Sequence, residues 1–167
     1  MRLRNCVLFV ISAILLSTAW AQQSKPAGAL AASDLKTVEP SSFFYRGQSA
    51  STQTRNSAGI RTQDQKYVLA GMVDTSGYAS SIAQKYQGFF ITEVKVKIEG
   101  SELNPGEYGF GFVDDKFLIT DCGANDVLSV SSKKDDELKR ATPLKLTKEG
   151  DAYRLYAGKK YVTVQVE

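Results

Sequence analysis

The clearest pattern of apolar and polar positions lies in residues 89–98, where apolar side chains alternate with charged ones. The charged positions are Glu93, Lys95 and Lys97, and the apolar positions between and before them include Phe90, Val94, Val96 and Ile98. Alternation with period two places one face of a strand in a core and the other face in water. Half-exposed strands of this kind are typical of antiparallel sheets. We therefore predict one strand over residues 89–98.

A second alternating run, residues 107–113, sets aromatic side chains against Gly109 and Gly111. Glycines on one face of a strand allow another backbone or an aromatic ring to approach closely. Turn signals follow at short intervals, at residues 104–106, 114–115, 149–151 and 157–159. Short strands separated by such turns indicate a β-sandwich or a β-barrel.

The spacing of Tyr78, Ile82 and Tyr86 predicts a helix, because steps of four residues place side chains on one helix face. Gly88 stands where such a helix would end. The predicted fold is therefore mostly β: an antiparallel β-sandwich or barrel with one short helix at about residues 76–87.

The N-terminus has the three parts of a secretory signal. Arg2 and Arg4 precede an apolar run over residues 6–16, and Ala19-Trp20-Ala21 provides a small-x-small cleavage site. The apolar run is about half the ~20 residues that a membrane-spanning helix needs. We therefore expect cleavage after Ala21 and export to the periplasm or the extracellular space.

The rest of the chain divides into two parts. Residues 22–41 are rich in Ala, Ser, Lys and Pro and predict a flexible leader, with a weak helical pattern near its middle. Residues 42–167 predict a single β domain. No transmembrane segment is expected after signal cleavage.

The net charge and the number of cysteines limit which partners and which covalent links are expected. Loss of Arg2 and Arg4 with the signal leaves 19 basic and 18 acidic side chains. A near-neutral balance gives no electrostatic reason to expect a nucleic acid partner. Cys122 is the one cysteine after the signal, so no intramolecular disulfide can form, and we expect its side chain to be buried.

Several kinds of chemistry are disfavoured by composition. The chain has no histidine, which removes Ser-His-Asp and Cys-His catalysis and histidine-ligated metal sites. A single cysteine after the signal removes cysteine-cluster metal sites and CxxC redox chemistry. We therefore expect a protein that is not an enzyme and that holds no metal and no cofactor.

Four carboxylates form one candidate constellation, because they could lie on adjacent loops at one end of a sheet: Asp114, Asp115, Asp121 and Asp126. Such a set could bind Ca²⁺, or two of its members could serve as the acid and base of glycoside hydrolysis. The alternative is that these side chains form turns by accepting hydrogen bonds from nearby backbone N–H groups.

Two further pairs are candidate ligand-binding residues. Tyr78 and Tyr86 could line a pocket beneath the predicted helix, although core packing is the alternative for any large aromatic side chain. Arg55 and Arg61 flank a predicted turn at Asn56-Ser57 and could bind a carboxylate or phosphate bidentately; a solvated loop is the alternative.

Residues 97–108 resemble a strand-turn-strand motif of secreted bacterial β-sandwich domains of unknown function. The residues that carry the resemblance are Ile98, Gly100, Leu103, Pro105, Gly106 and Tyr108. The resemblance implies an exported bacterial β domain, and it supplies no catalytic or binding residue.

These observations predict a non-enzymatic binding or envelope-associated β domain, whose partner is a protein, an envelope component or a small molecule. One alternative is a carrier that holds a small apolar ligand in a barrel or sandwich pocket. A second alternative is a carboxylate-based hydrolase.

Overall fold

The computed structural model describes residues 25–167. In this part of the chain the secondary structure is mostly β, with two antiparallel sheets and two short helices. The predicted signal peptide, residues 1–21, lies outside the described residues, as do the first three residues of the predicted leader.

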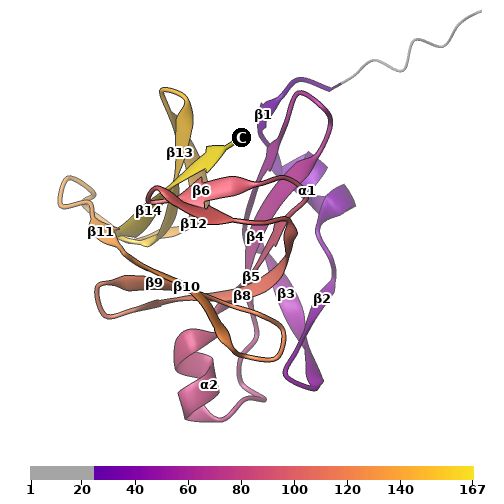
Figure 1. Ribbon diagram of the computed structural model, residues 1–167, viewed down its shortest axis with the longest axis vertical. Helices are drawn as coiled ribbons and strands as arrows, with labels where there is room; N and C mark the ends of the chain where they lie inside the picture. Colours follow the sequence, from indigo (N-terminus) through magenta and orange to yellow (C-terminus); the bar gives the residue numbers. More distant parts are fainter. Residues whose placement is uncertain (1–24) are drawn as a thin grey trace, which may run out of the picture.

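The larger sheet contains eight strands (Figure 1). Their order is β1 (Gly28–Ala29), β3 (Gln48–Arg61), β4 (Tyr67–Val73), β5 (Gly88–Thr92), β8 (Gly106–Val113), β9 (Lys116–Thr120) and β10 (Asp126–Ser131), and β2 (Ser42–Tyr45) pairs with β3 beside this path. Every pair of neighbouring strands is antiparallel.

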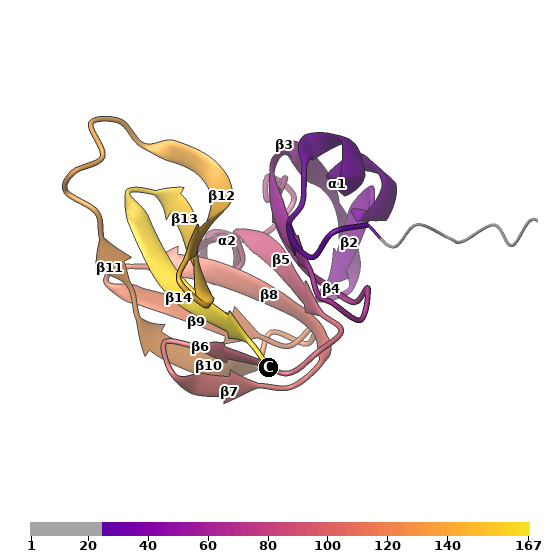
Figure 2. The same ribbon diagram turned by 90° about the horizontal axis from the view of Figure 1, so that it is seen from above.

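The smaller sheet contains six strands and packs against the larger one (Figure 2). Their order is β12 (Thr142–Glu149), β13 (Ala152–Gly158), β14 (Lys160–Val166), β6 (Val96–Ile98) and β7 (Ser101–Leu103), and β11 (Lys133–Lys134) also pairs with β14. Because the strands form two separate ladders rather than one closed cylinder, the fold is an antiparallel sandwich. The predicted fold class is confirmed in that form.

The main core lies between the two sheets. The larger sheet contributes side chains that include Ile60, Phe90, Phe110, Phe117 and Ile119, and the smaller sheet contributes Val96, Ile98, Leu144, Leu155, Val162 and Val164. All of these side chains are buried. Burial of this many large apolar side chains supplies most of the stabilisation, since residues 25–167 contain no disulfide.

A second core covers the opposite face of the larger sheet. Helix α1 (Ala32–Val38), strand β2 and the segment around helix α2 (Ser80–Lys85) bring in side chains that include Leu35, Phe43, Tyr45 and Tyr86. The central strands of the larger sheet are therefore buried on both faces. This explains why β4 is almost continuously apolar instead of alternating.

The predicted strand over residues 89–98 is in fact two strands in different sheets. The chain leaves the larger sheet after Thr92 and enters the smaller sheet at Val96. At the break, the Thr92 hydroxyl donates to the Val94 carbonyl, and the Glu93 carboxylate accepts from the Tyr67 N–H. The apolar face was predicted correctly, because Phe90, Val96 and Ile98 all lie in the main core.

The predicted helix at residues 76–87 is shorter than expected, since α2 covers only Ser80–Lys85. The Asp74 carboxylate accepts a hydrogen bond from the Ser76 N–H, which makes a turn rather than a helix cap. Tyr78 therefore precedes the helix, and Tyr86 follows it.

The described part of the predicted leader, residues 25–41, contains regular secondary structure, although the sequence predicts a flexible segment. It forms β1 and α1, and Leu35 of α1 is buried against the larger sheet. Leu30 donates its backbone N–H to the Gly59 carbonyl, which fixes this segment to β3. The sandwich therefore includes residues ahead of the predicted start at residue 42, and a second helix joins the predicted one.

Cys122 is half-buried rather than fully buried. Its Sγ lies 3.6 Å from the Glu107 carbonyl oxygen. Partial burial raises the pKa of the Cys122 thiol above its usual value, and the neighbouring Glu107 and Asp121 carboxylates raise it further.

Candidate functional site

A hollow lies where the larger sheet meets the edge of the smaller one. It has a volume of about 820 Å³ and is bounded by the β1–α1 segment, by β3 and by β12; we call it the α1–β12 groove. Seen from above, β12 faces the corner formed by α1 and β3 (Figure 2). The groove therefore depends on segments that are about 90 residues apart in sequence.

The floor and walls of the groove are largely apolar. Leu30, Leu35, Ala58 and Leu146 line it. Leu30 and Leu35 pack over Gly59, where an added Cβ would lie only 2.7 Å and 3.2 Å from their methyl groups. The absence of a side chain at Gly59 therefore lets the β1–α1 segment lie close enough to β3 to form a wall.

Three cationic side chains line the same groove: Lys36 of α1, Arg55 of β3 and Lys145 of β12. Lys36 and Arg55 are exposed, whereas Lys145 is half-buried with its Nζ 5.1 Å from the centre of the Tyr156 ring. None of the described residues that line the groove is an aspartate or a glutamate. The groove thus combines an apolar interior with three positively charged side chains and no negatively charged one.

Arg55 reaches the groove because β3 contains an irregularity. The β3–β4 register changes between Thr52, which faces Val73, and Ser57, which faces Gly71. The sequence prediction of two strands joined by a turn at Asn56-Ser57 was therefore wrong, since β3 continues through this point. Irregularities of this kind redirect side chains and are common beside functional sites.

Gln53 holds the irregularity in place. Its Nε2 donates to the Val73 carbonyl, its Oε1 accepts from Asn56 Nδ2, and its backbone carbonyl accepts from the Ser57 hydroxyl. Ser57 Oγ lies closer to Glu39 Oε1, at 2.5 Å, than to the Gln53 carbonyl, at 3.1 Å, so its single proton is shared between these two acceptors. The Glu39 carboxylate is thus directed at Ser57 rather than into the groove.

Arg61, the second predicted ligand-binding arginine, does not join Arg55 in the groove. Its side chain is almost fully buried and forms an ion pair with Asp34 of α1, with 3.5 Å between Nη2 and Oδ2. Lys25 also contacts the Asp34 carboxylate, at 2.6 Å, and this hydrogen bond and the Arg61 charge lower the pKa of Asp34. Arg61 therefore fastens α1, the helix that carries Lys36, to the sheet.

The structure brings the predicted pair Tyr78 and Tyr86 together, but inside the protein. The Tyr86 side chain has no exposed surface, and its ring stacks on Tyr45 with 3.8 Å between ring centres. Tyr78 meets Tyr86 edge to face at 5.2 Å, and its hydroxyl donates to the Tyr45 carbonyl. Burial raises the pKa of Tyr86 strongly. This cluster packs as core.

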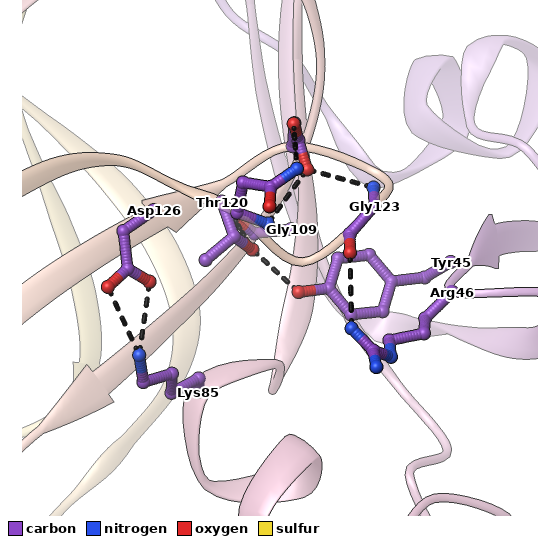
Figure 3. Close-up of polar contacts among 9 residues, drawn as sticks. Tyr45, Arg46, Lys85, Gly109, Thr120, Gly123 and Asp126 are labelled. Atoms are coloured by element: carbon purple, nitrogen blue, oxygen red, sulfur yellow. Dashed lines mark hydrogen bonds and ion pairs between the residues drawn. The ribbon is translucent and has the colours of Figure 1, made fainter.

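A polar contact anchors the tyrosine cluster to β9. The Tyr45 hydroxyl lies 2.8 Å from Thr120 Oγ1, and both side chains are buried. Figure 3 shows this contact. In contrast, the Tyr86 hydroxyl has no hydrogen-bond partner among the described residues.

The four acidic candidates do not assemble into one site. Asp114, Asp115 and Asp126 line a shallow hollow, and Lys85 Nζ contacts both Asp126 oxygens at 3.1 Å (Figure 3). Asp121 instead accepts hydrogen bonds from the Gly123 and Asn125 backbone, which lower its pKa together with the Asn125 side chain. Across residues 25–167, no three His, Cys, Asp or Glu side chains lie close enough together to hold a metal ion.

No protein-family model, curated protein or solved structure matches the chain. No helix within residues 25–167 is long and apolar enough to cross a membrane.

Sequence reasoning found one of the three groove cations, Arg55, because it lies in a polar segment with a second arginine. It did not find Lys36, Lys145 or the leucines that line the groove. Lys36 lies in a segment that reads as a leader, and Lys145 lies in an ordinary alternating strand. No local signal in the sequence indicates that these two segments meet.

Proposed function

We propose that the chain is an exported, non-enzymatic binding domain whose α1–β12 groove holds an amphipathic anion, a molecule with an apolar chain and one negatively charged head group. The observation that carries the proposal is the combination of an apolar groove with three cations and no carboxylate among its described lining residues. An apolar ligand without charge would leave the three cations without a role. A small inorganic anion would leave the apolar walls in contact with water.

The size of the groove supports a small-molecule ligand. Ligand pockets typically measure about 300–1,000 Å³ and combine apolar walls with a few polar groups that orient the ligand. Each CH₂ group of the ligand that leaves water contributes ~0.8 kcal/mol. The apolar chain would therefore supply most of the affinity, and Lys36, Arg55 and Lys145 would select the charge of the head group.

Export rests on the N-terminal pattern of Arg2 and Arg4, the apolar run over residues 6–16 and the Ala19-Trp20-Ala21 cleavage site. A binding role rather than catalysis agrees with a chain that lacks histidine and in which two of the four candidate carboxylates have other partners: Asp126 contacts Lys85, and Asp121 forms a turn. The ligand would then be taken up in the periplasm or outside the cell.

Titration with single-chain amphiphiles tests this proposal. We expect dodecanoate, below its critical micelle concentration, to bind the chain from Gln22 onward, which contains every described element. Dodecyltrimethylammonium should bind much more weakly because its head group is repelled by three cations, and butyrate should bind weakly because it buries few CH₂ groups. Equal affinity for the two long-chain amphiphiles, or no dodecanoate binding, would contradict the proposal.

Arg55→Gln is expected to weaken dodecanoate binding by about twofold to fivefold, which corresponds to the ~1 kcal/mol or less typical of an exposed ion pair. Arg140→Gln makes the same chemical change at an exposed residue that does not line the groove, and it should leave the affinity unchanged. Isothermal titration calorimetry measures both. Equal weakening in the two variants would show that only the net charge of the protein matters.

A further inference from the structure

Strand β10 has an unpaired edge. It is the last strand of the larger sheet and pairs with β9 on one side. Within residues 25–167, no backbone hydrogen bond connects its other side to any segment. Edge strands of this kind offer a row of N–H and C=O groups that can pair with another chain.

Three of the other edge strands carry the protections that natural edge strands use. Strand β12 contains Pro143, Lys145 and Lys148, while β7 has three residues and β1 has two. Proline, lysine and short length all oppose strand addition. These edges are therefore poor sites for pairing.

Strand β10 lacks most of these protections. Residues 127–132 contain neither a charge nor a proline, and Val127 is 47% exposed. One irregularity in the β9–β10 register lies at Val127, so the strand is regular only from Leu128 onward. The segment from Leu128 to Ser131 is thus the open part of the edge.

We propose that β10 pairs with β10 of a second copy of this chain, antiparallel and centred on Ser129, so that the two larger sheets join across a two-fold axis. In this register Leu128 of one copy faces Val130 of the other. Both side chains pack on the main core in a single copy, so the apolar inner face would continue across the junction. Ser129 faces Ser129 of the second copy.

The charges at the ends of β10 are compatible with self-pairing. In the same register Asp126 faces Ser132 of the second copy, so no like charges meet directly. Lys133 lies outside the contact, because it pairs with Tyr161 of β14 in the smaller sheet. A two-fold contact needs a surface that is complementary to itself. An uncharged central segment with apolar residues on either side of a serine meets this requirement.

The contact would be weak. Two strands of six residues bury less than the ~1,200 Å² at the lower end of stable interfaces. The dimer should therefore form in a concentration-dependent manner. Its existence is independent of the α1–β12 groove, because no residue of β10 lines that groove.

Sedimentation velocity over a range from low micromolar to near-millimolar concentration tests the proposal on the chain from Gln22 onward. We expect a monomer–dimer equilibrium for the unchanged protein. Ser129→Lys and Ser129→Glu should each be monomeric, because each places two like charges opposite one another at the two-fold axis. An equimolar mixture of the two variants should dimerise again.

Ser51→Lys is the matched control, since it adds the same charge to an exposed strand serine whose strand already pairs with β2. It should dimerise like the unchanged protein, and circular dichroism should show that all variants are folded. A monomer at every concentration would overturn the proposal. Dimerisation of Ser129→Lys alone, or failure of the mixture to dimerise, would also overturn it.

Discussion

Replacing Tyr86 with alanine is expected to lower the free energy of unfolding by about 3–5 kcal/mol, the usual cost of truncating a large buried aromatic side chain. Tyr86 has no exposed surface and contacts the rings of both Tyr45 and Tyr78. Its removal would leave a cavity between β2, β8 and the end of α2. Urea denaturation, followed by circular dichroism, measures the change.

Tyr86→Phe tests whether Tyr86 acts through its buried ring or through its hydroxyl group. Core packing needs only the ring. Because the Tyr86 hydroxyl has no partner among the described residues, its removal should change stability little or increase it slightly. Tyr45→Phe is the matched control, since it removes a hydroxyl that bonds to Thr120, and should cost about 1 kcal/mol. A larger loss for Tyr86→Phe than for Tyr45→Phe would contradict our placement of Tyr86.

Gly111→Ala is expected to destabilise the protein by about 3 kcal/mol, at the upper end of the cost of overpacking. An added Cβ would lie 2.4 Å from the Lys85 carbonyl oxygen and 2.9 Å from its carbon. The clash involves backbone, which no side-chain rotation can relieve, so α2 would have to move away from β8. In the absence of a clash, alanine would be favoured over glycine in a strand.

Gly77→Ala provides the control for this prediction. Its nearest neighbour would be Gln48 Oε1, at an ordinary contact distance of 3.6 Å. We expect its free energy of unfolding to stay within ~0.5 kcal/mol of the original. If Gly111→Ala and Gly77→Ala were equally stable in urea, the close approach of α2 to β8 would be wrong.

The glycine pattern shows what local sequence can predict. Alternation in residues 107–113 predicted that another backbone or a ring would approach the bare face of this strand. The structure confirms both, since Gly111 faces the Lys85 backbone and Gly109 faces the rings of Tyr45 and Tyr86. The hairpin turns at residues 114–115 and 149–151 were also correct, because turn residues act locally.

The errors arose where distant contacts override local pattern. Alternation continues through residues 93–95, but the chain changes sheets there because Glu93 is held by the backbone of Tyr67, 26 residues away. Residues 25–41 have the composition of a leader, yet Leu35 and the Asp34–Arg61 ion pair attach them to β3. Neither the contact of Glu93 with Tyr67 nor the attachment of residues 25–41 to β3 can be predicted without knowing which distant segments meet.

The candidate site was only partly predictable for the same reason. Arg55 and Arg61 look equivalent in the sequence, but the irregularity held by Gln53 places Arg55 beside the groove, while Arg61 is buried against α1. The groove itself requires β3 and β12 to lie side by side. That arrangement follows from the stacking of two sheets and leaves no periodic signal in either strand.

The position of α1 links the proposed export of the chain with the proposed ligand binding in the α1–β12 groove. It follows the predicted signal peptide by about ten residues, and it supplies both Leu35 and Lys36 to the groove. The segment that has the composition of a leader therefore forms a wall of the α1–β12 groove. A ligand held there would contact residues close to the N-terminus of the processed chain.

The most direct test of the groove as a binding site is a two-dimensional ¹⁵N–¹H NMR titration of the chain from Gln22 onward with dodecanoate. We predict that the largest shift changes will be at Leu35, Arg55, Ala58 and Leu146, which surround the groove. Residues at the hollow beside Asp126 should change little. Saturable changes centred on that hollow or on the tyrosine cluster, or no saturable change at all, would contradict the account.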